Sequence, residues 1–134
     1  MKKILVVEDD PRLNSNLAEL LLAEGYTPNS AGNGIEALKC IDEEIPDLII
    51  SDISMPEMNG MELLEKVKSN LRTSSVPFIF LTAKAESYDI RNGMNLGADD
   101  YLTKPFKTSV LLDSIAVRLK KREKSIKNKD EVGF

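Results

Sequence analysis

Charged and hydroxyl side chains directly follow four apolar segments of the sequence. Glu8 and Asp9 come after KILVV, Asp52 after DLIIS, Thr82 after PFIFL, and Lys104 after DYLT. Carboxylates brought together suit a hard divalent cation such as Mg²⁺, and a lysine beside them offers a point charge to a phosphate oxygen. Asp52 is then a candidate carboxylate nucleophile for a phosphoryl group, with Mg²⁺ and Lys104 stabilising the transferred charge.

The first of these segments runs into three consecutive acids, which raises an electrostatic problem. Glu8, Asp9 and Asp10 repel one another unless a cation lies close by. Asp10 has a structural explanation, because an acid directly before Pro11 is typical of a helix N-cap followed by the first helical position. We therefore expect a metal ion and Lys104 to offset the charges of Glu8 and Asp9.

The apolar segments are predicted to be β-strands. Continuous apolar runs at 3–7, 47–51 and 77–81 are typical of strands buried on both faces of a parallel sheet, whereas 26–31 and 100–103 predict weaker strands. Apolar residues at helical spacing predict the helices, at residues 11–24, 33–44, 59–70, 86–96 and 108–124. This alternation predicts an α/β fold, a doubly wound five-stranded parallel sheet with helices on both faces. Ligands of such sheets bind at the carboxyl ends of the strands, where the side chains above would meet.

Composition excludes several classes of protein. The 134 residues suit one domain, and the absence of histidine excludes His-based triads and His–metal sites within this chain. A single cysteine, Cys40, rules out an internal disulfide framework, and no apolar run is long enough for a membrane span. Residues 120–134 carry six basic and three acidic side chains, so the rest is acidic, which argues against a nucleic-acid groove. We expect a cytoplasmic protein without direct nucleic acid or membrane binding.

Four segments together resemble a known family. VVEDDP, SDISMPEMNG, FLTAK and GADDYLTKPF stand in the order and spacing of the receiver domain of two-component response regulators, over about residues 2–120. The resemblance implies the flavodoxin-like strand order 2-1-3-4-5 with five surrounding helices. It also implies that residues 1–120 form the receiver domain, with residues 121–134 as a polar C-terminal helix extension or linker.

The resemblance implies a role for each residue at the predicted edge. Asp52 is the implied phosphoacceptor, and the implied Mg²⁺ ligands are Glu8, Asp9, Asp52 and the backbone carbonyl of Ser54. Thr82 and Lys104 resemble the switch hydroxyl and the phosphate-binding lysine.

Two further family features lie near the end of the predicted domain. Tyr101 stands at the position of the switch aromatic, and a cis bond is implied between Lys104 and Pro105.

Partners and activity are implied by the same resemblance. A sensor histidine kinase or phosphotransfer domain would supply the phosphoryl group, in part by docking on the exposed side of the first helix. The chain would be a regulatory phosphoacceptor rather than an enzyme, limited to its own phosphorylation and dephosphorylation. A homodimer formed on activation stays open: Asp99, Asp100 and Arg118 are available for charged pairs, but Ile90 stands where dimerising transcription factors of the family often have arginine.

Three alternatives deserve comparison with this prediction. Residues 32–37, GNGIEA, match a dinucleotide-binding pattern, but the preceding TPNSA is a poor strand and the glycines fit a turn into the second helix. A phosphatase with an aspartate nucleophile would want a second acid where Ser54 stands. A constitutive binding module of the same fold is expected to lose an acid, the threonine or the lysine of the site, and this chain retains them all.

Overall fold

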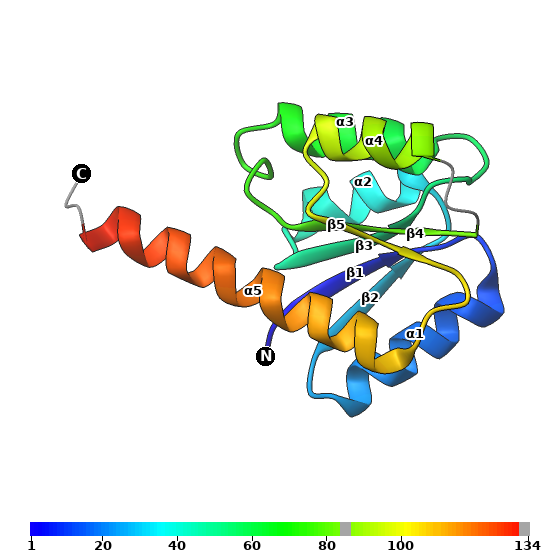
Figure 1. The fold of residues 1–134 in the computed structure, drawn as a ribbon, viewed down its shortest axis with the longest axis horizontal. Coiled ribbons are helices and arrows are strands. Elements are labelled where there is room, and N and C mark those ends of the chain that lie inside the picture. Colours follow the sequence, from blue (N-terminus) through cyan, green and yellow to red (C-terminus); the bar gives the residue numbers. More distant parts are fainter. Residues whose placement is uncertain (84–86, 132–134) are drawn as a thin grey trace.

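Five strands alternate with five helices along the residues that the computed structural model describes (Figure 1). The backbone is described for residues 1–83 and 87–131, and the side chains for residues 1–83 and 90–125. The strands are β1 (Lys3–Val7), β2 (Thr27–Ala31), β3 (Leu48–Asp52), β4 (Phe78–Thr82) and β5 (Asp100–Thr103). The helices are α1 (Pro11–Ala23), α2 (Gly34–Glu43), α3 (Gly60–Ser69), α4 (Ser87–Leu96) and α5 (Thr108–Glu131).

The strands form one parallel sheet in the order β2-β1-β3-β4-β5, which confirms the predicted α/β fold and strand order. The pairing register aligns the strand ends, because Val7 pairs with Ser51, Asp52 with Leu81, and Thr82 with Thr103. The loops that leave β1, β3, β4 and β5 therefore start from the same edge of the sheet.

Helices cover both faces of the sheet, with α2, α3 and α4 on one side and α1 and α5 on the other (Figure 1). Successive β1 side chains point to opposite faces. Leu5 and Val7 belong to the apolar core on the first side, and Ile4 and Val6 to the core on the second. All four side chains are at most 1% exposed, which explains the continuous apolar run in the sequence.

Element boundaries differ from the predicted ones by small shifts at two functional strands. β3 includes Asp52 and β4 includes Thr82, one residue further than predicted, because both residues continue the ladder to the neighbouring strand. The predicted start of the fourth helix at Glu86 lies outside the described residues. The functional side chains thus project from the last positions of strands.

Helix α5 is longer than predicted. The predicted end at Lys124 is wrong, because the helix continues to Glu131 and its last turns extend beyond the sheet (Figure 1). Arg122 Nη1 donates to the carbonyl oxygen of Asp47 at 3.1 Å, and Lys2 Nζ lies 2.9 Å from a Glu123 carboxylate oxygen. These contacts anchor the helix to the sheet, and the lysines and acids that follow are compatible with helix.

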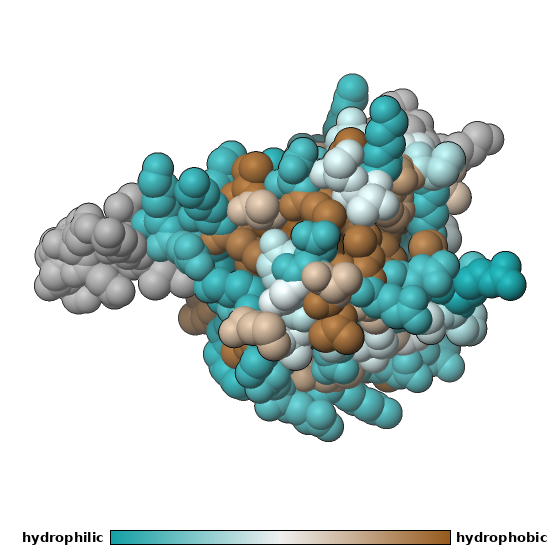
Figure 2. Space-filling model, turned by 90° about the horizontal axis from the view of Figure 1, so that it is seen from below, coloured by the Kyte–Doolittle hydropathy of each residue, from teal (hydrophilic) through white to brown (hydrophobic). Residues whose placement is uncertain are grey.

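The face that carries α1 and α5 keeps apolar side chains at the surface. Leu22 of α1 and Val110 and Val117 of α5 are partly exposed. Figure 2 shows apolar surface interrupted by polar side chains on the side where these helices lie. Among the described residues, no helix has both the length and the apolar composition needed to cross a bilayer.

Candidate functional site

The acidic pair lies in the tight connection between β1 and α1. Glu8 follows the last residue of β1 and is 2% exposed, whereas Asp9 is exposed. Asp10 is the N-cap of α1, and its side chain accepts hydrogen bonds from the backbone N–H groups of Arg12 and Leu13, which satisfies two donors at the helix start. The predicted N-cap role of Asp10 is confirmed.

Asp52 ends the central strand β3 and is 9% exposed. One carboxylate oxygen, Oδ1, accepts a hydrogen bond from the N–H of Ile53 at 2.7 Å. Behind the strand end, the N–H of Gly60 donates to the carbonyl oxygen of Ile53 at 2.8 Å. A Cβ on Gly60 would meet the Asp52 carbonyl oxygen at 2.1 Å, so this close approach requires glycine.

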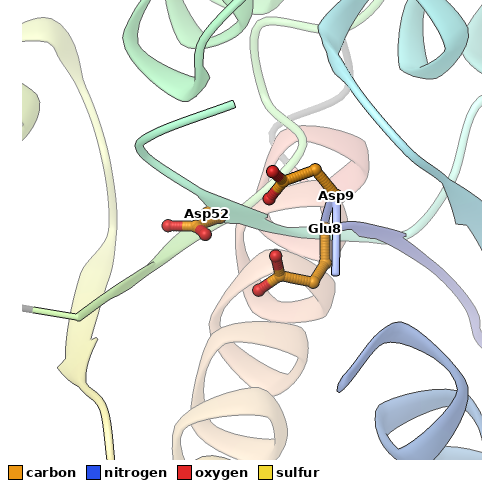
Figure 3. Close-up of side chains that lie close together, drawn as sticks. All are labelled: Glu8, Asp9 and Asp52. Atoms are coloured by element: carbon orange, nitrogen blue, oxygen red, sulfur yellow. The ribbon is translucent and has the colours of Figure 1, made fainter. Parts of the chain in front are cut away.

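The carboxylates of Glu8, Asp9 and Asp52 come together at the edge of the sheet (Figure 3). One oxygen from each lies within 4.8 Å of the others, a spacing that allows all three to bind one metal ion. Carboxylate oxygens are the ligands that Mg²⁺ and Ca²⁺ prefer. The donor set therefore fits a hard divalent cation.

Lys104 joins this cluster from the far end of the chain. Its Nζ lies 2.6 Å from Glu8 Oε1 and 3.1 Å from Asp52 Oδ2. The backbone N–H of Lys104 donates to the Thr82 carbonyl oxygen at 2.7 Å, which fixes the start of the loop after β5. The bond between Lys104 and Pro105 is cis, as the family resemblance implies.

The pKa values of Glu8 and Lys104 are both raised. Burial raises the pKa of Glu8, and the Asp52 charge adds to the shift, although the hydrogen bond from Lys104 opposes it. Burial also acts to lower the pKa of Lys104, but the hydrogen bonds and charges of Glu8 and Asp52 outweigh it, so the pKa of Lys104 is raised. Both shifts reflect a partly buried site that holds more carboxylates than ammonium groups.

The remaining predicted residues lie around this edge. Thr82 ends β4 and is 7% exposed, next to the strand that leads to Lys104. Tyr101 lies in β5 with 39% of its surface exposed, and Ser54 is an exposed residue of the loop after Asp52. The structure thus brings Glu8, Asp9, Asp52 and Lys104 into direct proximity, while Tyr101 faces solvent.

The glycine-rich GNGIEA segment forms the turn into α2, as predicted. Asn33 is the N-cap, with its side chain accepting from the N–H of Glu36, and the N–H of Gly34 donates to the Met58 carbonyl oxygen at 3.1 Å. The segment supports the loop after β3.

Sequence reasoning missed Asn14. This side chain is 8% exposed and donates to the carbonyl oxygens of Glu8 and Ala31, each at 3.0 Å. A signal was present, because Asn14 lies on the α1 face that also carries the buried residues Leu17 and Leu21.

The sequence model of the family described as "Response regulator receiver domain" matches residues 4–116. The chain belongs to this receiver family. As a receiver, it is a regulatory domain of two-component signal transduction with the flavodoxin-like fold.

The receiver is similar to parts of longer curated proteins. It is 38% identical over 122 residues to "DNA-binding response regulator MtrA" of Mycolicibacterium smegmatis, covering 91% of this chain and 52% of that protein. It is 41% identical over 125 residues to "Transcriptional regulatory protein DltR" of Streptococcus agalactiae, covering 92% of this chain and 54% of that protein. The chain thus spans about half the length of these relatives.

Solved structures of receivers have the same fold. A CheY-like response regulator receiver domain protein from Methanospirillum hungatei is 34% identical with a TM-score of 0.88, covering 93% of this chain and 98% of that one. A signal receiver domain of a histidine kinase from Syntrophus aciditrophicus is 36% identical with a TM-score of 0.84, covering 90% and 92%.

Proposed function

We propose that this receiver accepts a phosphoryl group on Asp52 in a Mg²⁺-dependent reaction and changes its surface in response. The observation that carries the proposal is the position of the Asp52 carboxylate. It ends the central strand within 4.8 Å of the Glu8 and Asp9 oxygens and 3.1 Å from Lys104 Nζ. A carboxylate held between a divalent cation site and an ammonium group is arranged for phosphoryl transfer.

Four groups form the proposed metal site: the carboxylates of Glu8, Asp9 and Asp52 and the backbone carbonyl of Ser54. The first three fit by geometry, and Ser54 is carried over from the family resemblance. Of the acidic pair, the exposed Asp9 would be the more direct ligand, whereas Glu8, whose Oε1 accepts a hydrogen bond from Lys104, would hold the ion through water. Mg²⁺ bound there would neutralise charge that develops on the phosphoryl oxygens.

The chain's own groups carry the transfer. An Asp52 carboxylate oxygen attacks the phosphorus in line, and the new oxygen–phosphorus bond forms as the bond to the donor breaks. The electron pair of that bond leaves with the donor, a histidine nitrogen of a kinase or a carboxylate oxygen of acetyl phosphate. Lys104 then turns its ammonium group to a phosphoryl oxygen.

Thr82 and Tyr101 are the proposed switch. Thr82 moves to hydrogen-bond the phosphoryl group, and Tyr101, now 39% exposed, turns inward to fill the space that Thr82 vacates. The two arrangements are populations of one molecule, and phosphorylation shifts the balance between them. The surface formed by α4, β5 and α5 carries the readout to an output partner or domain.

A sensor histidine kinase or a phosphotransfer domain is the proposed phosphoryl donor. A hollow of about 540 Å³ lies beside Lys104, between the start of α1 and the loop before α5. Its lining includes Arg12, Leu13 and Phe106, a mixture of apolar and charged groups suited to a helical partner. Docking there would bring a phosphohistidine close to Asp52.

Residues 1–120 are the receiver and 121–134 a helical extension or linker, in a cytoplasmic protein that does not bind nucleic acid through this chain.

The structure weakens the argument for a homodimer on activation, because two of the acidic side chains that could form its charged pairs already accept hydrogen bonds within the chain. Asp99 accepts from the N–H of Phe78 at 2.8 Å, and Asp100 accepts from Ser114 Oγ at 2.5 Å.

Phosphorylation by acetyl phosphate tests the proposal. Intact-protein mass spectrometry should show one added phosphoryl group on the wild type in the presence of Mg²⁺ and none after chelation. Asp52→Asn should abolish the addition, whereas Asp113→Asn, a change to an exposed carboxylate of α5, should not. Normal phosphorylation of Asp52→Asn would refute the assignment.

Beryllofluoride separates a switch from a constitutive binding module. With Mg²⁺ it should bind Asp52 as a phosphoryl mimic and alter the NMR signals of a labelled Tyr101 ring. Light scattering on the same samples reports whether activation also forms a dimer. An unchanged Tyr101 environment contradicts the switch while leaving phosphorylation intact.

A further inference from the structure

The side chain of Asn14 fixes the peptide unit that carries the acidic pair. Asn14 Nδ2 lies 3.0 Å from the carbonyl oxygen of Glu8 and 3.0 Å from that of Ala31. We propose that Asn14 is a positioning residue for the divalent cation site, holding Glu8 and Asp9 in a geometry ready for the metal. This inference rests on the proposed Mg²⁺ site and adds a residue to it.

The chemistry of the two acceptors decides which end of the Asn14 amide group faces them. Carbonyl oxygens only accept hydrogen bonds, so the group that faces both of them must be the amide NH₂ rather than the amide oxygen. Its two N–H groups match the two acceptors. With 8% of its surface exposed, Asn14 has little access to water, and a buried amide without partners would cost stability.

Two backbone hydrogen bonds add to those of the Asn14 side chain. The N–H of Glu8 donates to the same Ala31 carbonyl oxygen at 3.0 Å, and the N–H of Asn14 donates to the Asp10 carbonyl oxygen at 2.9 Å in the first turn of α1. The ends of β1 and β2 and the start of α1 are thereby joined through one side chain.

The Glu8 carbonyl group is part of the peptide unit that links the two proposed metal ligands, Glu8 and Asp9. Its oxygen belongs to the planar peptide unit that also contains the N–H of Asp9. Fixing that oxygen restricts rotation of the unit, and this rotation sets the directions in which the Glu8 and Asp9 side chains leave the backbone. Asn14 thus acts on both proposed ligands without contacting the metal.

Electrostatics explains why such a tie is needed. Three carboxylates lie within 4.8 Å, and Lys104 supplies one compensating charge to Glu8 and Asp52. Within the part of the chain that the structure describes, no lysine or arginine forms an ion pair with the exposed Asp9. Repulsion between like charges therefore favours an open loop in the metal-free protein, and the Asn14 bonds oppose this opening.

Titration of Mg²⁺ by calorimetry tests the inference directly. Asn14→Ala should weaken Mg²⁺ binding by roughly 10-fold, the lower end of the effect of removing groups that orient metal ligands. Leu17→Ala is the matched control, because it removes a buried α1 side chain of the core, with no hydrogen bond to the loop. It should lower the melting temperature while leaving the Mg²⁺ affinity within about twofold of wild type.

The Mg²⁺ dependence of phosphorylation gives a second readout. Asn14→Ala should raise the Mg²⁺ concentration for half-maximal phosphorylation by the same factor and leave the rate at saturating Mg²⁺ near wild type. A merely structural role would lower the melting temperature and leave this concentration unchanged.

Wild-type protein alone also tests the contacts, whether or not the variant folds. In metal-free protein, the side-chain NH₂ protons of Asn14 should exchange with solvent far more slowly than those of exposed Asn16. Equal exchange rates would overturn the inference. Wild type that binds no Mg²⁺ overturns the proposed metal site as well, whereas normal wild-type binding with unchanged affinity in Asn14→Ala overturns this inference alone.

Discussion

Lys104 Nζ lies 2.6 Å from Glu8 Oε1, so that two residues 96 positions apart in sequence form the shortest ion pair of the site. The pair closes the sheet edge from both ends of the domain, since Glu8 follows β1 and Lys104 follows β5. The ammonium group lies beside the Glu8 and Asp52 carboxylates and offsets part of their negative charge. The metal-free site is therefore held together by a charge that belongs to the protein itself.

Lys104→Met should destabilise the metal-free protein at neutral pH by about 2 kcal/mol, because it leaves the nearly buried Glu8 carboxylate without its charged hydrogen-bond donor. Saturating Mg²⁺ should restore more stability to the variant than it adds to wild type, since the cation then replaces the lost charge. Urea unfolding with and without Mg²⁺ measures both effects. The exposed neighbour Lys107→Met is the control, and an equal response of the two variants would contradict the prediction.

Asp9→Ala and Asp10→Ala should separate chemistry from capping. Asp9→Ala should abolish Mg²⁺-dependent phosphorylation of Asp52 with little change in stability, because the Asp9 side chain is exposed. Asp10→Ala should cost about 0.5–2 kcal/mol, since the N–H groups of Arg12 and Leu13 lose their acceptor. Phosphorylation by acetyl phosphate and thermal unfolding, measured on both variants, give the comparison. Similar losses of phosphorylation in the two variants would show that the acids share one role.

Gly60→Ala should be much more harmful than Gly25→Ala. A Cβ on Gly60 would lie 2.1 Å from the Asp52 carbonyl oxygen, so the strand end or the α3 start must shift, at about 3 kcal/mol. Gly25 has a φ of +90° but open space around it, and alanine there should cost about 1–2 kcal/mol from the backbone alone. Only Gly60→Ala should also slow phosphorylation of Asp52. Unfolding midpoints and acetyl phosphate kinetics test the contrast, which fails if Gly25→Ala is the more damaging change.

Cys40 should react slowly with thiol reagents in the native protein. Burial raises the pKa of the Cys40 thiol above its ordinary value, and the charges of Glu43 and Glu36 add to the shift. Less thiolate is then present at mildly alkaline pH, and the stabilising effect of the neutral thiol is lost as pH rises through the native pKa. The pH midpoint of iodoacetamide labelling should be higher in native than in urea-unfolded protein. A native midpoint at or below the unfolded one would contradict this expectation.

Much of the fold was predictable because the signals are local and strong. The uninterrupted apolar runs of β1, β3 and β4 identify central strands, since their side chains enter both cores. Once these strands are parallel, the residues at their ends must share one edge. This is why Glu8, Asp52 and Lys104 could be grouped in advance although 96 residues separate the first from the last. The individual roles of these residues remain predictions.

Some of what could not be predicted depends on contacts between distant segments. Asn14 has a polar side chain in a helix, and nothing local shows that the carbonyls of Glu8 and Ala31 lie within its reach. The length of α5 was underestimated for a different, local reason. The residues after Lys124 are mostly polar and lack the apolar spacing that predicts a helix, although their lysines and acids are compatible with one.

Strand β2 has a consequence for the behaviour of the folded protein in concentrated solution. It is an outer strand of the sheet with the sequence TPNSA. Its Pro28 has no backbone N–H and so cannot donate a hydrogen bond to a further strand. Exposed polar side chains at Thr27, Asn29 and Ser30 accompany it. A short, polar outer strand containing proline is a poor template for pairing with another sheet. Association of two copies by strand pairing along this edge is thereby disfavoured, even in concentrated solution.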